Sequence, residues 1–187
     1  MRALSALALM LSCAVGQAAP QRIVSLNMCT DQLLIDLAEP RHIVGLSPFA
    51  RDPARAFEAT RAARFPILSG TAEEVMVIRP DLVVSSRYMK RETRQFITAR
   101  GLTLVEFDDP RTLAEARTQI AEMGRLLGVE TRASERLAAF DAALSELREA
   151  ASRKTLQILP LARRGWVAGS ETLLADLLRE AGLMNAA

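Results

Sequence analysis

The feature that most constrains the fold is a long amphipathic segment between about residues 131 and 153. Apolar side chains recur there every three or four positions with charged side chains between them, at Leu137, Phe140, Leu144, Leu147 and Ala151. This spacing predicts one helix of roughly 30 Å, the width of a small domain. Because the flanking segments both alternate between strand-like and helix-like patterns, we expect this inter-lobe helix, residues 130–153, to join two α/β lobes.

The segment before the helix, residues 20–129, has the pattern of a complete α/β lobe. Short apolar runs begin near residues 22, 42, 82 and 102, and amphipathic segments lie between most of them. A further short extended piece is expected at 67–70. We expect a mainly parallel sheet covered on both faces, with ligand loops beyond the carboxyl ends of its strands. Those loops are residues 27–30, 47–51, 86–88 and 108–109.

Three helix starts are predicted from capping residues. Thr71 and Glu74 have the spacing of a capping box, which leaves Glu73 free to point elsewhere. Asp109 is expected to cap a helix that begins at Pro110, and Ser170 to cap the last helix.

The segment after the long helix, residues 154–187, contains only an apolar run and one amphipathic helix pattern. One strand and one helix cannot enclose a core. We therefore expect either that the chain is a piece of a longer protein or that this tail packs against the first lobe.

The first residues predict a signal peptide, residues 1–18. Met1 and Arg2 are followed by an apolar run over 3–15 and by a small-x-small site, so cleavage is expected near Ala18. A membrane anchor is disfavoured because the run is shorter than the ~20 residues of a spanning helix. A lipoprotein cysteine at Cys13 stays open as an alternative. After cleavage Cys29 is the only cysteine, which excludes an intrachain disulfide.

The residue types argue against most catalytic chemistry. A net charge of +2, with arginines interleaved among acidic residues, does not indicate nucleic-acid binding. His42 is the only histidine, and it begins a strand at the end opposite the ligand loops. A metal site built from protein side chains and a bound cofactor are therefore not expected. Cys29, at a helix amino terminus, is the one candidate nucleophile, so an exported thiol-dependent enzyme is the alternative function.

Several segments together resemble the periplasmic substrate-binding proteins of ABC importers for iron–siderophore complexes and cobalamin. The resemblance covers essentially the whole mature chain and depends on the order and spacing of the segments. They are Arg22 to Asn27 with Cys29 to Leu34, Ile43 to Ser47, Glu73 seven residues before Pro80, the long helix, and Gly169-Ser170 leading to Leu173-Leu174 and 181–185.

The resemblance implies an α/β fold of two Rossmann-like lobes joined by one long helix, with the second lobe incomplete. It implies a non-enzymatic, monomeric periplasmic receptor that holds a ferric siderophore or corrinoid between the lobes and delivers it to an inner-membrane ABC permease. Haem is a neighbouring ligand class, and a non-functional truncated product is a third possibility. The metal would arrive already chelated, which agrees with the lack of protein ligands.

By position, the resemblance implies a set of ligand-binding residues and one docking residue. Aromatic side chains would cover the apolar body of the ligand, and arginines would pair with its anionic groups. The ligand-binding residues are Asn27, Phe49, Arg51, Arg87, Tyr88 and Trp166. Core packing stays open for Phe49 and Trp166, and a solvated surface role for Arg51 and Arg87. Glu73 would dock on the permease, and a second docking glutamate would lie beyond Ala187.

Overall fold

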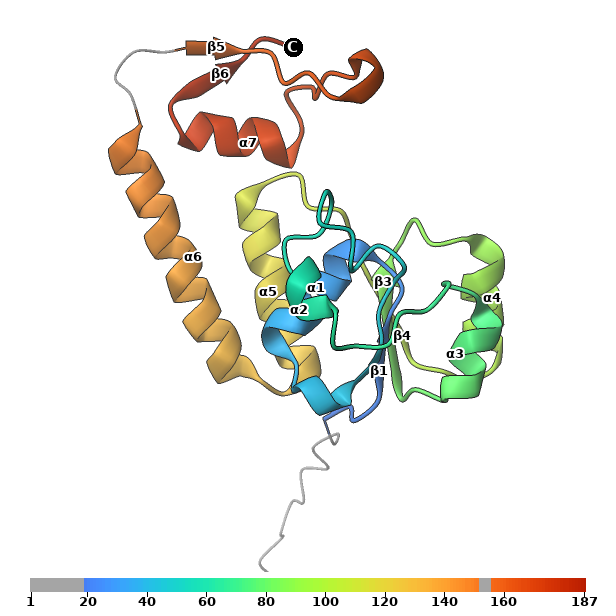
Figure 1. The fold of residues 1–187 in the computed structure, drawn as a ribbon. Helices are drawn as coiled ribbons and strands as arrows, with labels where there is room; N and C mark the ends of the chain where they lie inside the picture. Colours follow the sequence, from blue (N-terminus) through green and yellow to red (C-terminus); the bar gives the residue numbers. More distant parts are fainter. Residues whose placement is uncertain (1–18, 152–155) are drawn as a thin grey trace, which may run out of the picture.

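The computed structural model describes residues 19–151 and 156–187, so the predicted signal peptide lies outside the described residues. Strands and helices alternate along the chain, as predicted (Figure 1). The elements up to the long helix are β1 (Ile23–Ser25), α1 (Met28–Leu37), the 3-10 turn η1 (Pro40–His42), β2 (Ile43–Gly45), α2 (Ala59–Ala62), α3 (Ala72–Ile78), β3 (Leu82–Ser86), α4 (Arg91–Ala99), β4 (Leu104–Phe107), α5 (Leu113–Leu127) and α6 (Glu130–Ala150). After it come β5 (Leu156–Ile158), the 3-10 turn η2 (Arg163–Gly165), α7 (Leu173–Glu180) and β6 (Leu183–Asn185).

The first lobe is built on a four-stranded sheet with the order β2-β1-β3-β4, and every pairing in it is parallel. This confirms the expected parallel α/β sheet. The short extended piece predicted at 67–70 is not a strand of its own, because only Ile67 pairs, through an isolated bridge to Leu46.

Helices cover both faces of the sheet, α1 and α5 on one side and α3 and α4 on the other (Figure 1). Alternate strand residues face opposite sides. Ile23, Leu82 and Val84 join one apolar cluster with residues of α1 and α5. Val24 and Val83 join the second, with Val75 of α3 and Ile97 of α4. The fully buried strands explain why the sequence shows continuous apolar runs there.

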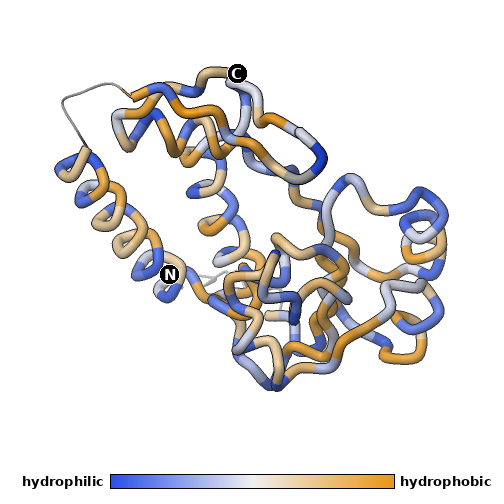
Figure 2. Tube along the Cα trace, turned by 45° about the horizontal axis from the view of Figure 1, so that its top comes forward, coloured by the Kyte–Doolittle hydropathy of each residue, from blue (hydrophilic) through white to orange (hydrophobic). Residues whose placement is uncertain are grey.

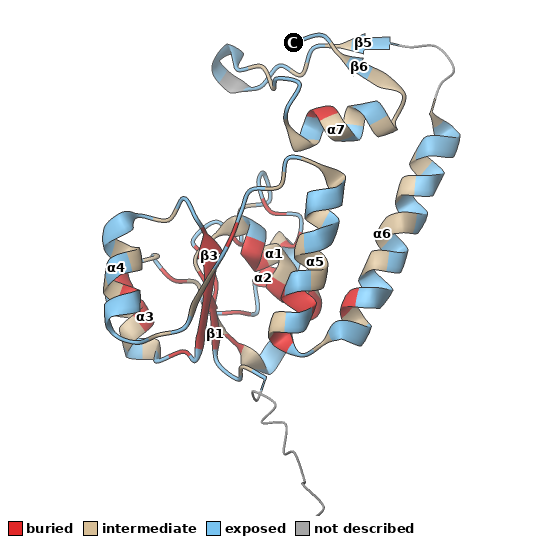
Figure 3. Cartoon of the chain, turned by 180° about the vertical axis from the view of Figure 1, so that it is seen from behind, coloured by how far each residue is buried: buried red, intermediate tan, exposed pale blue. Residues whose placement is uncertain are grey.

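The long helix is α6, which confirms the helix predicted from the apolar spacing; positions 152 and 153 of that prediction lie outside the described residues. Gly128 ends α5 in the left-handed conformation, and the chain turns directly into α6. The two helices approach closely where Gly124 faces Ala133: a Cβ on Gly124 would lie 2.4 Å from the Cβ of Ala133. Ala133 is the only buried residue of α6, so the rest of the helix is partly or fully exposed (Figure 3).

The tail after α6 forms a parallel pair of strands, β5 and β6, with α7 beside them. Two polar contacts join α7 to the helices below it. The Leu113 N–H at the start of α5 donates to Asp176 Oδ2 at 2.8 Å, and Arg148 of α6 pairs with Glu180. The tail therefore contacts the first lobe and the long helix, which is one of the two arrangements expected.

The tail contains many apolar residues, as the hydropathy colouring in Figure 2 shows, and several of the large ones are exposed. Ala175 is its only buried residue among those described. Its exposed large apolar side chains are Leu156, Leu159, Leu161, Trp166, Leu174, Leu177 and Met184. The tail therefore has no core of its own. The exact division into domains at 129/130 and 153/154 stays a prediction.

Two predicted helix starts are wrong by two or three residues. Thr112, not Asp109, caps α5, and its hydroxyl accepts the Glu115 N–H at 3.1 Å. Thr172, not Ser170, caps α7 in the same way. In both cases a threonine with an extended backbone lies three residues before the amide that it caps. This threonine, and not the Asp or Ser before it, therefore begins the helix. None of the described helices is long and apolar enough to cross a membrane.

Candidate functional site

The carboxyl ends of the strands of the first lobe all point toward the tail (Figure 1). The loops at these ends carry the predicted site residues of the first lobe. Asn27 lies in the turn between β1 and α1 and caps α1, and its side-chain oxygen accepts the Cys29 N–H at 2.8 Å. The main-chain oxygen of Asn27 accepts hydrogen bonds from Ser25 Oγ at 3.1 Å and Thr30 Oγ1 at 3.0 Å.

A buried carboxylate ties α1 to the loop after β2. Asp31 is fully buried and accepts two hydrogen bonds from Ser47, from its N–H at 3.1 Å and from its hydroxyl at 2.5 Å. Burial raises the pKa of the Asp31 carboxyl, and hydrogen bonds from Ser25 and Ser47 act in the opposite direction. The Ser47 hydroxyl oxygen also accepts the Phe49 N–H at 3.3 Å. Asp31 therefore helps to hold the loops that carry Asn27 and Phe49.

The next predicted residues, Phe49 and Arg51, have different surroundings. Phe49 is 46% exposed, and the guanidinium of Arg55 lies 5.5 Å from its ring centre. Arg51 instead donates to three main-chain oxygens of its own lobe, those of Ala62, Ala63 and Phe65. This use of its donors fits a structural role, so we do not include Arg51 in the proposed site.

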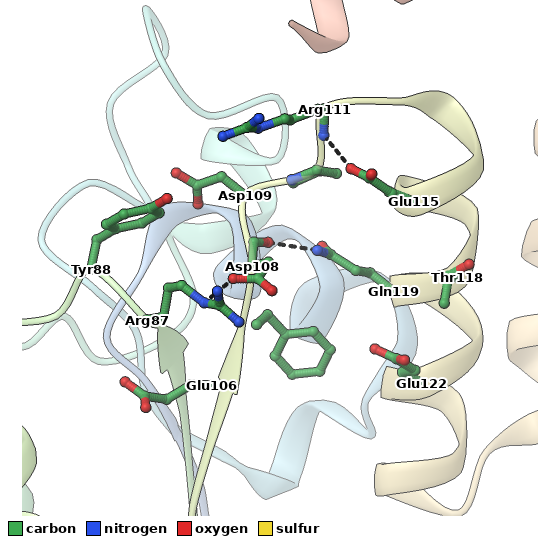
Figure 4. Close-up of a pocket in the computed structure, with 12 residues that line it drawn as sticks. Arg87, Tyr88, Glu106, Asp108, Asp109, Arg111, Glu115, Thr118, Gln119 and Glu122 are labelled. Carbon is green, nitrogen blue, oxygen red and sulfur yellow. Dashed lines mark hydrogen bonds and ion pairs between the residues drawn. The ribbon is translucent and has the colours of Figure 1, made fainter. Parts of the chain in front are cut away.

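Arg87 and Tyr88 line a cavity of about 550 Å³ beyond the carboxyl ends of β3 and β4 (Figure 4). Arg87 forms an ion pair with Asp108. Tyr88 is 71% exposed and lies with Asp109 across the cavity from Thr118 and Glu122 of α5. The cavity thus has an exposed aromatic ring on one side and a polar helix face on the other.

The loop between β4 and α5 forms the rest of the cavity wall. The Arg111 N–H donates to Glu115 Oε2 at 2.6 Å, and Gln119 Nε2 donates to the main-chain oxygen of Asp108 at 2.5 Å. These bonds fix residues 108–111 as a loop rather than as the first turn of α5. Because the helix was expected to begin at Pro110, Arg111 was placed inside it and was not predicted as a site residue.

The tail supplies Trp166, which is 75% exposed. It lies in the turn closed by the bridge between Leu161 and Val167, and its main-chain oxygen accepts the Ala162 N–H at 2.7 Å. Of the predicted ligand-binding residues, the cavity brings together Arg87 and Tyr88, while Asn27, Phe49, Arg51 and Trp166 lie outside its lining. Asp109, Arg111 and Glu122 are lining residues that the sequence reasoning did not select. Of these three residues, only Asp109 had a signal in the sequence, namely its position in a loop at the carboxyl end of a predicted strand.

Cys29, the candidate nucleophile, is an exposed free cysteine in the first turn of α1. Although the residue is exposed to solvent, neighbouring protein partly desolvates its thiol and so raises the Cys29 pKa, and the charges of Asp109 and Asp31 raise it further. The direction of this shift is opposite to the lowered pKa that is typical of a reactive cysteine at a helix amino terminus. His42 lies in the turn before β2, at the opposite end of the sheet from Cys29. The described residues hold no cluster of three or more histidine, cysteine or acidic side chains able to bind a metal.

Glu73, the predicted docking residue, is exposed in the first turn of α3. The predicted capping box is present in part, since the Thr71 hydroxyl accepts the Glu74 N–H. The carboxylate of Glu74 instead accepts the N–H of Ser69 at 2.7 Å, together with its hydroxyl. No hydrogen bond or ion pair to another described residue is formed by the Glu73 side chain, so it is available to a partner.

Comparison with known proteins identifies a family model and relatives that are all binding proteins. Residues 23–187 match the sequence model of a family described as periplasmic binding protein. A cobalamin-binding protein of Halobacterium salinarum is 25% identical over 175 residues, which are 90% of this chain and 46% of that protein. The chain therefore spans about half the length of the curated relatives that it matches.

Solved structures with the same fold include heme-binding proteins. The apo form of the periplasmic heme-binding protein RhuT from Roseiflexus sp. RS-1 is 26% identical, with a TM-score of 0.70, over 89% of this chain and 66% of that chain. The periplasmic heme-binding protein HutB of Vibrio cholerae is 19% identical, with a TM-score of 0.75, over 88% of this chain and 65% of that chain. At that identity HutB shows the fold alone. The match confirms the expected two-lobed fold, of which this chain holds only part of the second lobe.

Proposed function

The chain belongs to the periplasmic binding protein family, and from this premise we propose that it is a non-enzymatic receptor for a chelated metal. Its ligand is a corrinoid, a heme or a ferric siderophore, which it delivers to an ABC permease in the inner membrane. The family and the structural relatives indicate a periplasmic location. Export through a signal peptide cleaved near Ala18 is part of the proposal.

The observation that carries the proposal is the position of the cavity. It lies beyond the carboxyl ends of β3 and β4, on the side of the lobe that faces the tail. In parallel α/β sheets ligands bind at this end of the strands. The exposed rings of Tyr88 and Phe49 supply apolar surface for a macrocycle or chelate, and Trp166 supplies the same from the tail.

A receptor for a chelated metal also accounts for the side chains present. The ligand carries its own metal-coordinating atoms, so the protein has to recognise only the outer surface of the chelate. The raised pKa of Cys29 and its distance along the sheet from His42 give no support to a thiol-dependent enzyme.

The experiment that tests ligand capture uses Trp166, the only tryptophan of the chain. Tryptophan fluorescence of the purified protein is titrated with cyanocobalamin, hemin and a panel of ferric siderophores. We expect saturable quenching by one ligand class at micromolar concentration or below. Because heme and corrinoids also absorb the emitted light, free N-acetyltryptophanamide is titrated with each ligand in parallel, and only quenching beyond that of this control counts as binding. Absence of saturable quenching by every ligand, with no binding by calorimetry, would contradict the proposal.

We propose that delivery depends on Glu73, through an ion pair with the permease. Val77 lies one turn further along α3 and is 83% exposed, so it supplies apolar contact area beside the charge. Glu73→Arg should abolish ligand uptake by cells while leaving ligand affinity in solution unchanged. Glu92→Arg, the same change on exposed α4, is the matched control and should leave uptake intact. Equal uptake by both variants would remove Glu73 from the docking surface.

A further inference from the structure

The charge of the cavity wall bears on which chelate it accepts. Two arginines and five carboxylates line the cavity, so its lining carries an excess of negative charge. The carboxylates are those of Glu106, Asp108, Asp109, Glu115 and Glu122, which we call the acidic wall. Arginines were expected to attract an anionic ligand, and this balance is the reverse of that expectation.

Of the two arginines in the cavity lining, only Arg87 is occupied by the protein itself, because the Arg111 guanidinium forms no hydrogen bond or ion pair with another described residue. Arg87 is paired with Asp108 on the same wall, and Arg94 behind the wall is paired with Glu106 at 2.7 Å. An anionic ligand would have to break the Arg87 pair to use that arginine, which leaves Arg111 as the one lining cation against the acidic wall. Asp109 and Glu122, in contrast, form no ion pair or hydrogen bond through their carboxylates with any other residue of the described ranges.

The negative potential extends beyond the cavity lining to the loop after β1. Asp109 lies near enough to Cys29, at the start of α1, that its charge raises the pKa of that thiol. The negative charge of Asp109 therefore affects the electrostatic potential at two strand-end loops, those after β1 and β4. A ligand bound over these loops is exposed to the same negative potential.

Resting on the proposed receptor function, we infer that the ligand surface facing the acidic wall is uncharged or cationic and that a carboxylate or catecholate placed there is rejected. Amide side chains, which present N–H donors to carboxylates, fit this wall. A cavity of about 550 Å³ accommodates the edge of a chelate that carries such groups. Among the proposed ligand classes, the amide-substituted corrinoid satisfies this requirement, and a heme whose free propionates point to the wall does not.

The first test uses pairs of ligands that differ in charge and hardly in shape. Cyanocobalamin is compared with its isomeric monocarboxylates, in which one side-chain amide is hydrolysed, and hemin with its propionate diamide. At low salt we expect the neutral member of a pair to bind about fivefold tighter than the carboxylate placed at the wall. The preference should shrink in ~0.5 M salt, because screening shortens the range of the field.

Asp109→Asn connects the preference to the acidic wall. This variant should bring the affinities of the two pair members closer together, mainly by improving binding of the carboxylate. Glu130→Gln, at the start of α6 and outside the cavity lining, should not. Equal affinities of all pair members in the wild type, or tighter binding of the carboxylates, would overturn the inference and leave the receptor function standing. A lack of binding by every ligand would instead overturn the receptor function and, with it, the assignment of a ligand class.

A second test measures the field without any ligand. Cys29 is alkylated with neutral iodoacetamide and with anionic iodoacetate, and peptide mass spectrometry separates it from Cys13. The ratio of the two rates cancels the thiolate fraction, because both reagents attack the same thiolate. Relative to a short cysteine peptide, iodoacetate should be disfavoured about fivefold at Cys29, and Asp109→Asn should remove most of this difference. A ratio equal to that of the peptide would show that the wall exerts no repulsion and would refute the inference.

Discussion

Gly124 lies in α5 at its closest approach to α6, and we predict that Gly124→Ala destabilises the protein although alanine favours helices. The added methyl group would lie 2.4 Å from the Cβ of Ala133. This is about 1 Å inside ordinary contact. Overpacking of this kind costs about 1–3 kcal/mol, and the gain in helix propensity offsets about 1 kcal/mol of it. The expected net loss is up to about 2 kcal/mol.

A methyl swap between the two helices makes the prediction specific. Ala133→Gly alone should cost about 1 kcal/mol of helix propensity and about 0.8 kcal/mol of lost burial. In the double variant the methyl on residue 124 meets only backbone, the Cα atoms of residues 133 and 130, each at 3.8 Å. The propensity terms then cancel. We expect the double variant to be within about 0.5 kcal/mol of the wild type.

Urea unfolding followed by far-ultraviolet circular dichroism measures these differences. Ser134→Ala, on the exposed side of α6 next to Ala133, is the control and should change stability by no more than about 0.5 kcal/mol. The close packing of α5 on α6 is refuted if Gly124→Ala is stabilising by its propensity alone and the double variant is no more stable than Ala133→Gly.

The remaining predictions concern single side chains. Arg148→Ala should return the lowered pKa of Glu180 toward its ordinary value, since the hydrogen bond from Arg148 is the main cause of the shift; a carboxyl-carbon NMR titration measures it. That bond adds stability above the unfolded-state pKa of about 4.3, and the contribution is lost as the pH falls through the lowered folded value. Asp31→Ala should cost about 1–3 kcal/mol in urea unfolding, because the buried Ser47 N–H and hydroxyl lose their acceptor. Because burial raises the pKa of Asp31, the free energy of unfolding of the wild type relative to Asp31→Asn should be highest below the unfolded-state pKa of about 3.9. This difference in stability should decrease as the pH rises through the raised folded-state pKa. An equal difference at acidic and neutral pH would contradict the prediction. Alkylation of Cys29 by iodoacetamide should show a midpoint above the ordinary thiol pKa, and Cys29→Ser should leave ligand binding unchanged.

The site was predictable from the sequence only as far as the ends of the strands. Parallel strands bring their carboxyl ends to one edge, so the loops containing Asn27, Phe49, Arg87 and Tyr88 could be named in advance. Which of their side chains are available depends on partners distant in sequence. Arg51 donates to main-chain oxygens more than ten residues away, and Arg87 is paired with Asp108 in the loop after β4.

The sequence by itself determined the class of fold. Apolar runs for buried parallel strands, helical spacing between them and the long amphipathic segment of α6 are local patterns, because burial of one face imposes a period on the chain. The tertiary structure decided the charge of the site. Coulomb energies depend on distances in space, and only folding places Asp109 and Glu122 around one cavity while it pairs Arg87 with Asp108. The sequence therefore indicated where a ligand would bind, and the packing of β4 against α5 decided what charge that ligand can carry.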